Sequence, residues 1–516
     1  MTAPQGRSFR FPGSEVSIVA VAFLLLAGLV FATQNRTVGW EPGYDELQPK
    51  HHGWVSSHTL AIIAHATWDN AFVGYAETGI DENGARQYDY FDRYPVFFSA
   101  GMHALLSLKS RLSTQIYLAK QAMNGIFLLT VVAAFLLIHK LTGRLLSSFA
   151  IAVFSMSSPY LLFYKDMVHY DQPALLGILI LIYAIAVYEI DHRRRPVYLA
   201  ALLAVSLGRG YASFPVLGMW AFLDVLRALR QPGAPSARGW LRLLRLDSVR
   251  VLALAVAWGA ICLLYNIGVE AYRRGVAFGD TSIVLSAVNR LALNEGFNES
   301  YLRILNWSTF LQDQVIRIVR WSFPVWQYEG SVALSAAVVI GLFVAIGLYA
   351  RGLDPNRRVV VMVLAASGVV WLMAMRNLSA FHDYTAMYYL GVPLAFFAAV
   401  TSRWRFPRGV WIAVVVGVLA VFTSRDMMIQ ELHVKLGEPY NAYTHDFMRI
   451  AAALPGPGQT IDLEDKVPYA PYAFGFYLPD DLQAPMAIAD YVISRDPDFL
   501  PTNLTPENDH LYLFRK

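Results

Sequence analysis

Two short polar motifs in the first third of the sequence contain residues that can do chemistry. Asp45 and Glu46 are adjacent carboxylates that follow the first strongly apolar segment, and Asp92-Arg93 precedes another apolar run. A carboxylate can take a proton from an attacking hydroxyl group, and the planar fork of an arginine suits a phosphate. Each motif also has a plain alternative: solvated loop carboxylates that cap the next helix, and a surface Asp-Arg pair that contributes little to stability.

The composition places these motifs on a membrane protein. Of the 516 residues, 56% are hydrophobic and only 16% are charged, and the mean hydropathy is +0.40. Such a chain is far more apolar than a soluble domain, so several membrane spans are expected. The net charge of +4 adds little, because the positions of basic residues matter more than their sum in membrane proteins. The single cysteine, Cys262, lies in an apolar run, which excludes a disulfide framework or a cysteine metal site.

Eleven apolar segments are predicted to cross the membrane, since about 20 apolar residues span its hydrocarbon core. Arg7 and Arg10 precede the first segment, which reads as an uncleaved anchor with the N-terminus in the cytoplasm. An odd number of spans then puts the C-terminus outside. The segments are 15–33, 115–139, 145–164, 172–190, 196–207, 212–226, 249–268, 331–350, 359–375, 384–400 and 409–423.

The basic residues support this topology. Each of the five loops that the count places in the cytoplasm is rich in arginine or lysine. The sequence Gly208-Arg209-Gly210 interrupts the apolar residues between 196–207 and 212–226; if these were one span, every later basic loop would lie on the wrong side. We find no internal repeat, which disfavours the inverted-repeat folds of secondary transporters.

Three outer segments are long, namely 34–114, 269–330 and 425–516. In the middle one, apolar residues at helical spacing predict an amphipathic helix over 298–325 at the membrane surface, with Trp307, Trp321 and Trp326 at headgroup depth. The tail loses the long apolar runs and gains turns. It predicts a small α/β domain with a helix near 443–454 and strands at 460–463, 474–478, 491–494 and 510–514.

The order of these motifs resembles a known family. An Asp-Glu pair after the first span, followed by Tyr-Phe-Asp-(Lys/Arg)-x-Pro and an apolar helix, is similar to the polytopic GT-C glycosyltransferases of the protein mannosyltransferase and lipid A aminoarabinose transferase kind. The resemblance covers the first ten spans by order, through short motifs. It implies an α-helical polytopic membrane protein of the GT-C fold, with a transmembrane domain over 1–424 and a small extracytoplasmic α/β domain over 425–516.

The resemblance also implies an activity. Such enzymes move a sugar from a polyprenyl-phosphate donor to a lipid, glycan or protein acceptor at the outer face of the membrane, and direct displacement would invert the anomeric configuration. The usual setting is a bacterial inner membrane facing the periplasm, with membrane lipids as further partners and no nucleic acid. The alternative is a non-catalytic membrane subunit that kept the fold and lost the chemistry. Departures such as Tyr94, where relatives have a proline, permit that alternative.

By position in these motifs, Asp45 is the expected base, with Glu46 and Asp171 as helpers. Asp171 heads the fourth span, where a helix cap is the competing explanation. Arg93, Arg209, Arg376 and His382 are expected to face one donor phosphate in a single outer cavity. The full set expected to bind substrate is Asp92, Arg93, Lys165, Asp166, Arg209, Arg376, His382 and Tyr384, although Lys165 also fits an interfacial lysine that reaches toward the headgroups.

Four histidines of the first outer segment, His51, His52, His58 and His65, raise the question of a metal ion. Three of them recur every seven residues, which places them on one helix face but about 10 Å apart. One ion cannot bridge that distance. Divalent cations serve oligosaccharyltransferases in the wider superfamily, but the closer relatives generally act without one, so no cofactor is expected and a divalent cation is the alternative.

Overall fold

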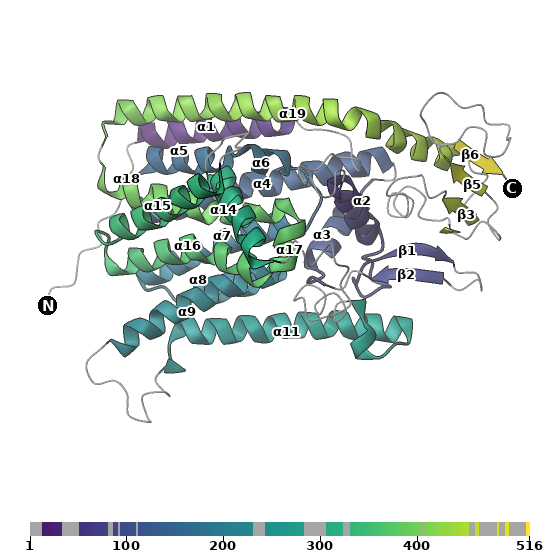
Figure 1. The fold of residues 1–516 in the computed structure, drawn as a ribbon, viewed down its shortest axis with the longest axis horizontal. Helices are drawn as coiled ribbons and strands as arrows, with labels where there is room; N and C mark the ends of the chain where they lie inside the picture. Colours follow the sequence, from purple (N-terminus) through teal and green to yellow (C-terminus); the bar gives the residue numbers. More distant parts are fainter. Residues whose placement is uncertain are drawn as a thin grey trace.

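The computed structural model shows an elongated bundle of helices that run mostly along one axis, with small β-sheets at one end (Figure 1). It describes residues 13–33, 51–80, 86–90, 93–109, 112–230, 243–282, 306–322, 331–404, 406–453, 460–463, 482–483, 491–494 and 512–515.

In the described part of the chain, long helices predominate and the strands are short. The helices are α1 (Gly13–Ala32), α2 (His51–Ala64), α3 (Phe97–Leu106), α4 (Leu112–Thr142), α5 (Leu145–Met156), α6 (Pro159–Phe163), α7 (Asp171–Asp191), α8 (Arg195–Ser206), η1 (Gly210–Ser213), α9 (Phe214–Leu229), α11 (Asp247–Arg274), η2 (Phe278–Asp280), α14 (Trp307–Ser322), α15 (Val332–Ala350), α16 (Pro355–Ala374), α17 (Arg376–Phe381), η3 (Asp383–Leu390), α18 (Gly391–Arg403) and α19 (Arg408–Ala453). The strands are β1 (Tyr75–Ile80), β2 (Arg86–Tyr90), β3 (Thr460–Leu463), β4 (Leu482–Gln483), β5 (Tyr491–Ser494) and β6 (Tyr512–Arg515).

Nine helices in the described part of the chain are long and apolar enough to cross a membrane, so this is an integral membrane protein. They coincide with nine of the eleven predicted spans. The other two predicted spans, 145–164 and 196–207, are shorter apolar helices, α5 and α8. α5 stops at Met156 because Pro159 starts the separate helix α6, and α8 stops at Ser206 ahead of a turn that contains Gly208.

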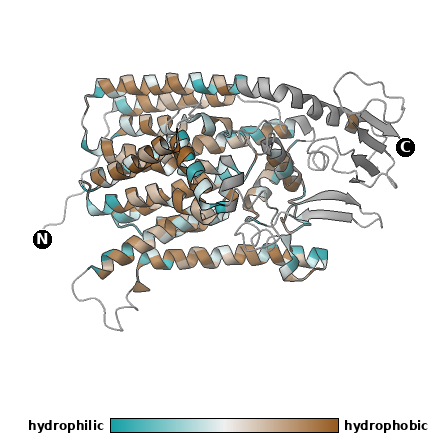
Figure 2. Cartoon of the chain, in the orientation of Figure 1, coloured by the Kyte–Doolittle hydropathy of each residue, from teal (hydrophilic) through white to brown (hydrophobic). Residues whose placement is uncertain are grey.

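Burial separates central helices from peripheral ones. In the most apolar window of α7, 72% of the residues are buried, and in the span Tyr384–Arg403 the share is 83%, whereas α1 and α15 reach only 22% each. A helix that is apolar all round and buried belongs to the core, and one that is apolar but exposed faces lipid. α7 packs on α4, α8 and α16, and α18 packs on α15 and α16. Figure 2 shows that apolar residues predominate on the long helices of the bundle and that hydrophilic residues occur at several of their ends.

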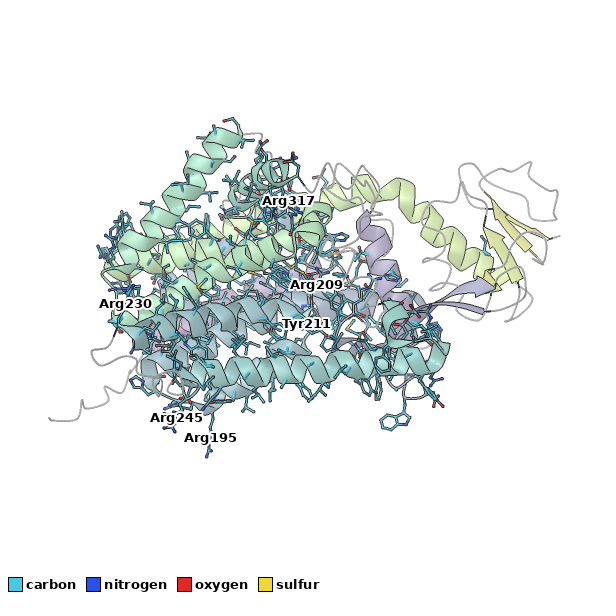
Figure 3. The ribbon with its side chains drawn as sticks, turned by 60° about the horizontal axis from the view of Figure 1, so that its bottom comes forward. Arg195, Arg209, Tyr211, Arg230, Arg245 and Arg317 are labelled. Carbon is cyan, nitrogen blue, oxygen red and sulfur yellow. The ribbon has the colours of Figure 1, made fainter. Side chains whose placement is uncertain are left out.

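Arginines that the sequence places on the cytoplasmic side lie together. Arg195, Arg230 and Arg245 are exposed and gather at one end of the bundle, whereas Arg209 lies near the middle of the molecule (Figure 3). Arg195 belongs to the predicted cytoplasmic loop before span 196–207, whereas Arg230 and Arg245 belong to the one between spans 212–226 and 249–268. This grouping agrees with the basic-loop argument, and the side of the membrane itself stays a prediction.

The first outer segment is folded in its described part. α2 is followed by an antiparallel hairpin of β1 and β2, and α3 is the apolar helix expected after Pro95. β1 contacts β4, which belongs to a four-stranded sheet of order β4-β3-β5-β6. In that sheet β3 pairs in parallel with β4 and β5, and β5 pairs antiparallel with β6.

Most of the strands expected in the tail are present. Predicted strands 460–463 and 491–494 are β3 and β5, and 510–514 corresponds to β6. Predicted strand 474–478 lies outside the described residues. The two-residue strand β4 has no counterpart in the prediction, because two residues are too few to show an alternating pattern.

One helix carries the chain from the bundle to the tail. α19 runs for 46 residues, so the last predicted span and the helix predicted near 443–454 are parts of the same helix. The predicted domain boundary at 424/425 falls inside it. The change from apolar to polar residues after Thr423 indicates the end of the apolar surface, but polar residues can continue a helix.

The amphipathic helix predicted over 298–325 is observed as α14. It packs on α15, α17 and η3, and its buried residues include Phe310, Ile318 and Val319. Trp321 is only 2% exposed, and its ring stacks on that of Tyr160 at 5.5 Å. The prediction of Trp321 as a headgroup-level tryptophan is therefore wrong, because the residue packs in the core. Trp326 lies outside the described residues.

Candidate functional site

The carboxylate of Asp171 is the centre of a buried polar group at the start of α7. Its Oδ1 accepts a hydrogen bond from the hydroxyl of Tyr388 at 2.8 Å. Its Oδ2 lies 2.6 Å from Nδ1 of His169 and 3.1 Å from Nη2 of Arg209. All four side chains are buried. A buried carboxylate needs such partners, because an unpaired charge in an apolar interior is very costly.

Asp171 does not cap its helix. The N-cap residue of α7 is Tyr170, whose side chain makes no capping hydrogen bond, and Asp171 is the first helical residue. Its carboxylate binds side chains from the turn before η1 and from η3 instead. A negative charge in the first turn also interacts favourably with the helix dipole. The helix-cap explanation considered from the sequence is therefore wrong.

The interruption Gly208-Arg209-Gly210 is what brings Arg209 to Asp171. Gly208 has a φ of +52°, and a Cβ at this position would lie 2.1 Å from the carbonyl oxygen of Tyr170. A residue with a side chain tolerates neither condition. The turn lies so close to α7 that the backbone N–H of Arg209 donates to that same carbonyl at 3.0 Å. The short helix α8 thus ends where its following arginine reaches the carboxylate.

The motif around Arg93 contacts the group around Asp171 through Tyr94, the residue that follows Arg93. The guanidinium carbon of Arg209 lies 5.1 Å from the ring centroid of Tyr94. The Tyr94 ring packs on Tyr170 at 4.8 Å, and the Tyr170 hydroxyl is hydrogen-bonded to Ser99 at 2.8 Å. A cation over an aromatic face is attracted to it. The tyrosine that stands where relatives have a proline therefore has its own contact with Arg209, while Arg93 is partly exposed beside it.

A row of rings connects the late motif to Asp171. The His382 ring lies 5.2 Å from that of Tyr384, and Tyr384 lies 5.2 Å from His169. His169 in turn contacts the Asp171 carboxylate. Tyr384 is 2% exposed, so it contributes to the wall of the site as a buried ring. The structure thus places four of the predicted residues, Asp171, Arg209, Tyr384 and His382, in one chain of contacts that also includes His169 and Tyr94.

The charges of this group follow from its burial. Burial lowers the pKa of His169, against the opposing effect of the Asp171 carboxylate, and Arg209 and His58 lower it further. The lowered pKa favours a neutral His169 ring near pH 7, with its Nδ1 in contact with the Asp171 carboxylate. Burial acts most strongly on the pKa of Arg209 and lowers it, but Asp171 together with Tyr94, Tyr384 and Tyr388 raises that pKa by more, so the guanidinium stays charged.

Lys165 and Asp166 belong to two other buried ion pairs. Nζ of Lys165 lies 2.5 Å from Oδ1 of Asp426 on α19, and Nζ of Lys120 on α4 lies 3.5 Å from Oδ2 of Asp166. All four side chains have an exposure of 0%. The interfacial explanation of Lys165 is therefore wrong. A contact of Lys165 with a donor phosphate, as predicted, would require breaking its pair with Asp426.

Arg376 makes a different kind of contact. Its guanidinium lies 4.4 Å from the ring centroid of Trp307 on α14. From the same helix, Arg317 donates to the backbone carbonyl of Ser379 at 2.6 Å. These contacts attach α14 to the segment that carries Arg376 and His382. The predicted meeting of Arg376 with Arg209 at one phosphate stays a prediction.

Three predicted site residues, Asp45, Glu46 and Asp92, lie outside the described residues, as do the side chains of His51 and His52. The ring of His65 stacks on Tyr75 at 4.5 Å. Within the described ranges, no three His, Cys, Asp or Glu side chains are grouped so that they could hold a metal ion. The expectation about a cofactor stays untested.

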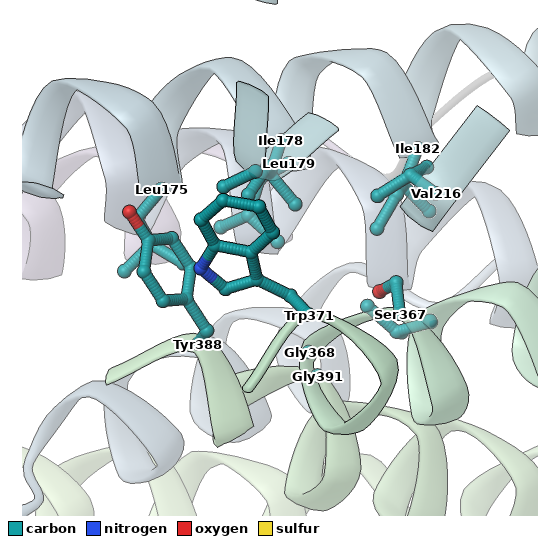
Figure 4. A pocket seen from close by; sticks show the side chains of 12 residues that line it. Leu175, Ile178, Leu179, Ile182, Val216, Ser367, Gly368, Trp371, Tyr388 and Gly391 are labelled. Atoms are coloured by element: carbon teal, nitrogen blue, oxygen red, sulfur yellow. The ribbon is translucent and has the colours of Figure 1, made fainter. Parts of the chain in front are cut away.

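An apolar cavity lies beside Tyr388, between α7, α9, α16 and α18 (Figure 4). Leu175, Ile178, Trp371 and Tyr388 are among its lining residues. The indole nitrogen of Trp371 is buried there, without a hydrogen-bond partner among the described residues. The lining is too apolar for a sugar or a phosphate, so the cavity belongs to the packing around Tyr388 and not to a substrate site.

Sequence reasoning missed several residues of these groups. His169 and Tyr388 lie within the motifs but have no signal of their own. Lys120 and Asp426 do have one: a lysine lies inside the predicted span 115–139, and a carboxylate lies three residues after the end of the predicted span 409–423. Charges in or beside an apolar span are costly and need a partner, so pairing such residues with Lys165 and Asp166 would have found both bridges.

Comparisons of the whole chain give a match only at the level of structure. No protein-family model matches the sequence, and no curated protein sequence matches it. The crystal structure of ArnT from Cupriavidus metallidurans bound to undecaprenyl phosphate is similar, with a TM-score of 0.57 and 13% identity over 92% of this chain and 86% of that one. The apo structure of that protein gives a TM-score of 0.56 with 12% identity over 91% and 86%. The apo oligosaccharyltransferase of Archaeoglobus fulgidus gives 0.48 with 10% identity over 95% and 70%.

These comparisons define the class of protein by its fold. The likeness to ArnT extends over most of both chains and includes the long apolar helices, so the chain is an integral membrane protein with the GT-C fold. The fold predicted from the order of the motifs is confirmed. At 13% identity the likeness concerns the fold, and the activity has to be argued from the site.

Proposed function

We propose that the protein is a membrane glycosyltransferase that moves a sugar from a polyprenyl-phosphate donor to the hydroxyl group of a lipid, glycan or protein acceptor at the outer face of a bacterial inner membrane. The fold supports this proposal, because the similar ArnT structure is bound to undecaprenyl phosphate. The observation that carries it is the meeting of Arg209, Asp171 and Tyr94 in one buried group, although three distant segments supply them.

The reaction needs a base and a cation. The bond between the anomeric carbon and the phosphate oxygen breaks, a bond to the acceptor oxygen forms, and the acceptor proton passes to a carboxylate. The products are the glycosylated acceptor and the polyprenyl phosphate. The phosphate is already a weak base, so it needs cations to stabilise its charge and no acid to protonate it.

Arg209 has the properties of such a cation. It stays charged, and Tyr94 and Asp171 fix its orientation before any substrate binds, which favours electrostatic stabilisation of a leaving phosphate. Both oxygens of Asp171 are already engaged by Tyr388, His169 and Arg209. Asp171 is therefore better suited to position Arg209 than to take the acceptor proton, and that role falls to Asp45 with Glu46 beside it.

A binding and turnover experiment tests the proposal. Full-length protein in lipid nanodiscs is titrated with undecaprenyl phosphate, with retention measured by native mass spectrometry. Wild type and Arg230→Lys, which changes an exposed arginine at one end of the bundle, should bind alike. Arg209→Lys should bind about tenfold or more weakly, because lysine loses the planar fork. Turnover is measured as release of polyprenyl phosphate from a mixture of lipid-linked sugars in bacterial membrane extract.

The outcomes separate the candidate functions. Binding with release supports the transferase. Binding without release from any lipid-linked sugar favours the non-catalytic subunit. If Arg209→Lys binds as well as wild type, the donor phosphate does not lie at Arg209 and the proposal loses its main support.

A further inference from the structure

The carboxylate of Asp426 joins three segments of the chain at one buried point. Its Oδ1 lies 2.5 Å from Nζ of Lys165, and its Oδ2 accepts a hydrogen bond from the hydroxyl of Thr33. Lys165 also donates to the Thr33 hydroxyl at 3.3 Å, so Asp426, Lys165 and Thr33 form a triangle of contacts. Thr33 directly follows α1, Lys165 lies in the turn before α7, and Asp426 lies within α19.

This triangle fastens α1 to α19 at one of two places. The two helices run side by side (Figure 1). At their far end Arg408 donates to the Ser14 hydroxyl at 2.7 Å and lies 3.8 Å from Glu15. That contact is largely exposed and contributes little, whereas Asp426 and Lys165 are fully buried. Removing one partner of a buried pair leaves an uncompensated charge, so the Asp426 end is the stronger fastening.

The segments that meet at Asp426 are those that lead to the predicted carboxylates. The chain continues from Thr33 into the segment that contains Asp45 and Glu46. On the other side, Lys165 precedes His169 and Asp171 in a short stretch that is buried throughout. One side chain of the last span therefore holds the starting points of both segments.

We propose that Asp426 is a positioning residue, which holds the exit of the first span against residues 164–171 through Thr33 and Lys165. We call the contacts among Asp426, Lys165 and Thr33 the lock. Because Lys165 has no exposed surface and its charge is paired, Lys165 acts in this lock and not as a ligand of the donor. The expected effect of Asp426 on turnover rests on the proposed function. Its expected effect on the structural order of residues 164–171 is independent of that function.

Hydrogen–deuterium exchange of the full-length protein in nanodiscs tests the lock. In Asp426→Asn, peptides covering 157–172 and the end of α1 up to Thr33 should take up deuterium several-fold faster, while helices distant from the lock keep their rates. The matched control is Asp191→Asn, which breaks the exposed Lys140–Asp191 pair at 2.5 Å and should change neither region.

Thr33 variants test the triangle without disturbing its charges. Thr33→Val keeps the Lys165–Asp426 pair, so faster exchange should be confined to the end of α1. Thr33→Ser restores the hydroxyl and should restore the wild-type rates. Unchanged exchange at 157–172 in Asp426→Asn, or a uniform increase across all helices, would overturn the proposal.

Turnover is measured separately with the same variants. Displacing the reacting groups by about 1 Å can cost a hundredfold in rate, so Asp426→Asn should lower the turnover number by about ten- to a hundredfold with little change in KM. Faster exchange with unchanged turnover would overturn the positioning role. If exchange rises as expected but wild type transfers no sugar, the lock stands and the proposed function fails.

Discussion

Asp171 and Arg209 form an ion pair at 3.1 Å in the buried centre of the bundle, although the whole of α7 and α8 separates them along the chain. The pair depends on a glycine turn that presses against α7, and on His169 and Tyr388, which satisfy the remaining capacity of the carboxylate. Neither charge is isolated. This is how an apolar bundle retains a fixed arginine where the proposed donor phosphate would bind.

Breaking this pair should destabilise the protein strongly. Asp171→Leu leaves Arg209 buried without its carboxylate and should lower the free energy of unfolding by about 3–5 kcal/mol, and Arg209→Met should do the same to Asp171. In the double variant both charges are gone, so its loss should be much smaller than the sum of the two. Unfolding in detergent followed by circular dichroism gives the three values; simple additivity would mean that the two residues do not interact.

The turn at Gly208 should tolerate no side chain. Gly208→Ala forces a left-handed conformation on alanine and places its Cβ against the Tyr170 carbonyl, which should cost about 1–3 kcal/mol or more and weaken undecaprenyl phosphate binding through Arg209. Gly218 on α9 is the control, since a Cβ there meets open space and alanine should gain about 0.5–1 kcal/mol. Thermal unfolding of the two variants compares them directly. Equal stability of both would contradict the strained turn.

The same glycine shows where sequence reasoning succeeds and where it stops. Apolar length and the basic loops predict eleven spans, and nine of these are long apolar helices in the described part of the chain, because the cost of exposing polar backbone to lipid leaves few alternatives. Gly208-Arg209-Gly210 was visible as an interruption, but its meaning depends on Tyr170, a contact that no local pattern encodes. The pairing of Lys165 with Asp426 is likewise a contact between residues far apart in the sequence. The position of Lys165 in the sequence suggested that it binds the donor, whereas in the structure it is paired with Asp426.

Tyr94 shows that a residue can also be misjudged from its motif alone. From the motif it is a departure from relatives that have a proline, and it weakened the case for catalysis. In the structure the guanidinium carbon of Arg209 lies 5.1 Å from the centroid of the Tyr94 ring, so this tyrosine has a contact of its own within the site. A substitution in a motif cannot be interpreted until its neighbours in space are known.

The stability of the site should fall in mild acid through His169. Its pKa in the folded protein is lowered by burial, against Asp171, with Arg209 and His58 adding to the lowering. The unfolded chain therefore takes up a proton first as the pH falls below about 6.5, and the contribution of neutral His169 to stability, fully present above that pH, is lost. His169→Gln cannot titrate, so its melting temperature should fall less than that of wild type between pH 7.5 and 5.5. Parallel decreases would assign the pH dependence to other groups.

The last prediction concerns the base. The acceptor hydroxyl is a poor nucleophile at neutral pH, and a carboxylate within hydrogen-bond reach must take its proton as the new bond forms. Asp171 is occupied by three partners, which leaves Asp45 as the candidate. Asp45→Asn keeps the shape and removes the basicity, so it should lower turnover by about two to four powers of ten and leave undecaprenyl phosphate binding nearly intact.

Glu46→Gln is the matched control for this prediction, since it removes the neighbouring carboxylate of the same motif and should have a smaller effect on turnover. Wild-type transfer by Asp45→Asn together with loss of transfer in a folded Asp171→Asn protein would move the base to Asp171. If neither substitution changes the release of polyprenyl phosphate, neither Asp45 nor Asp171 takes the proton and the base is another group; a non-catalytic subunit with the GT-C fold becomes the better account only if wild type releases none.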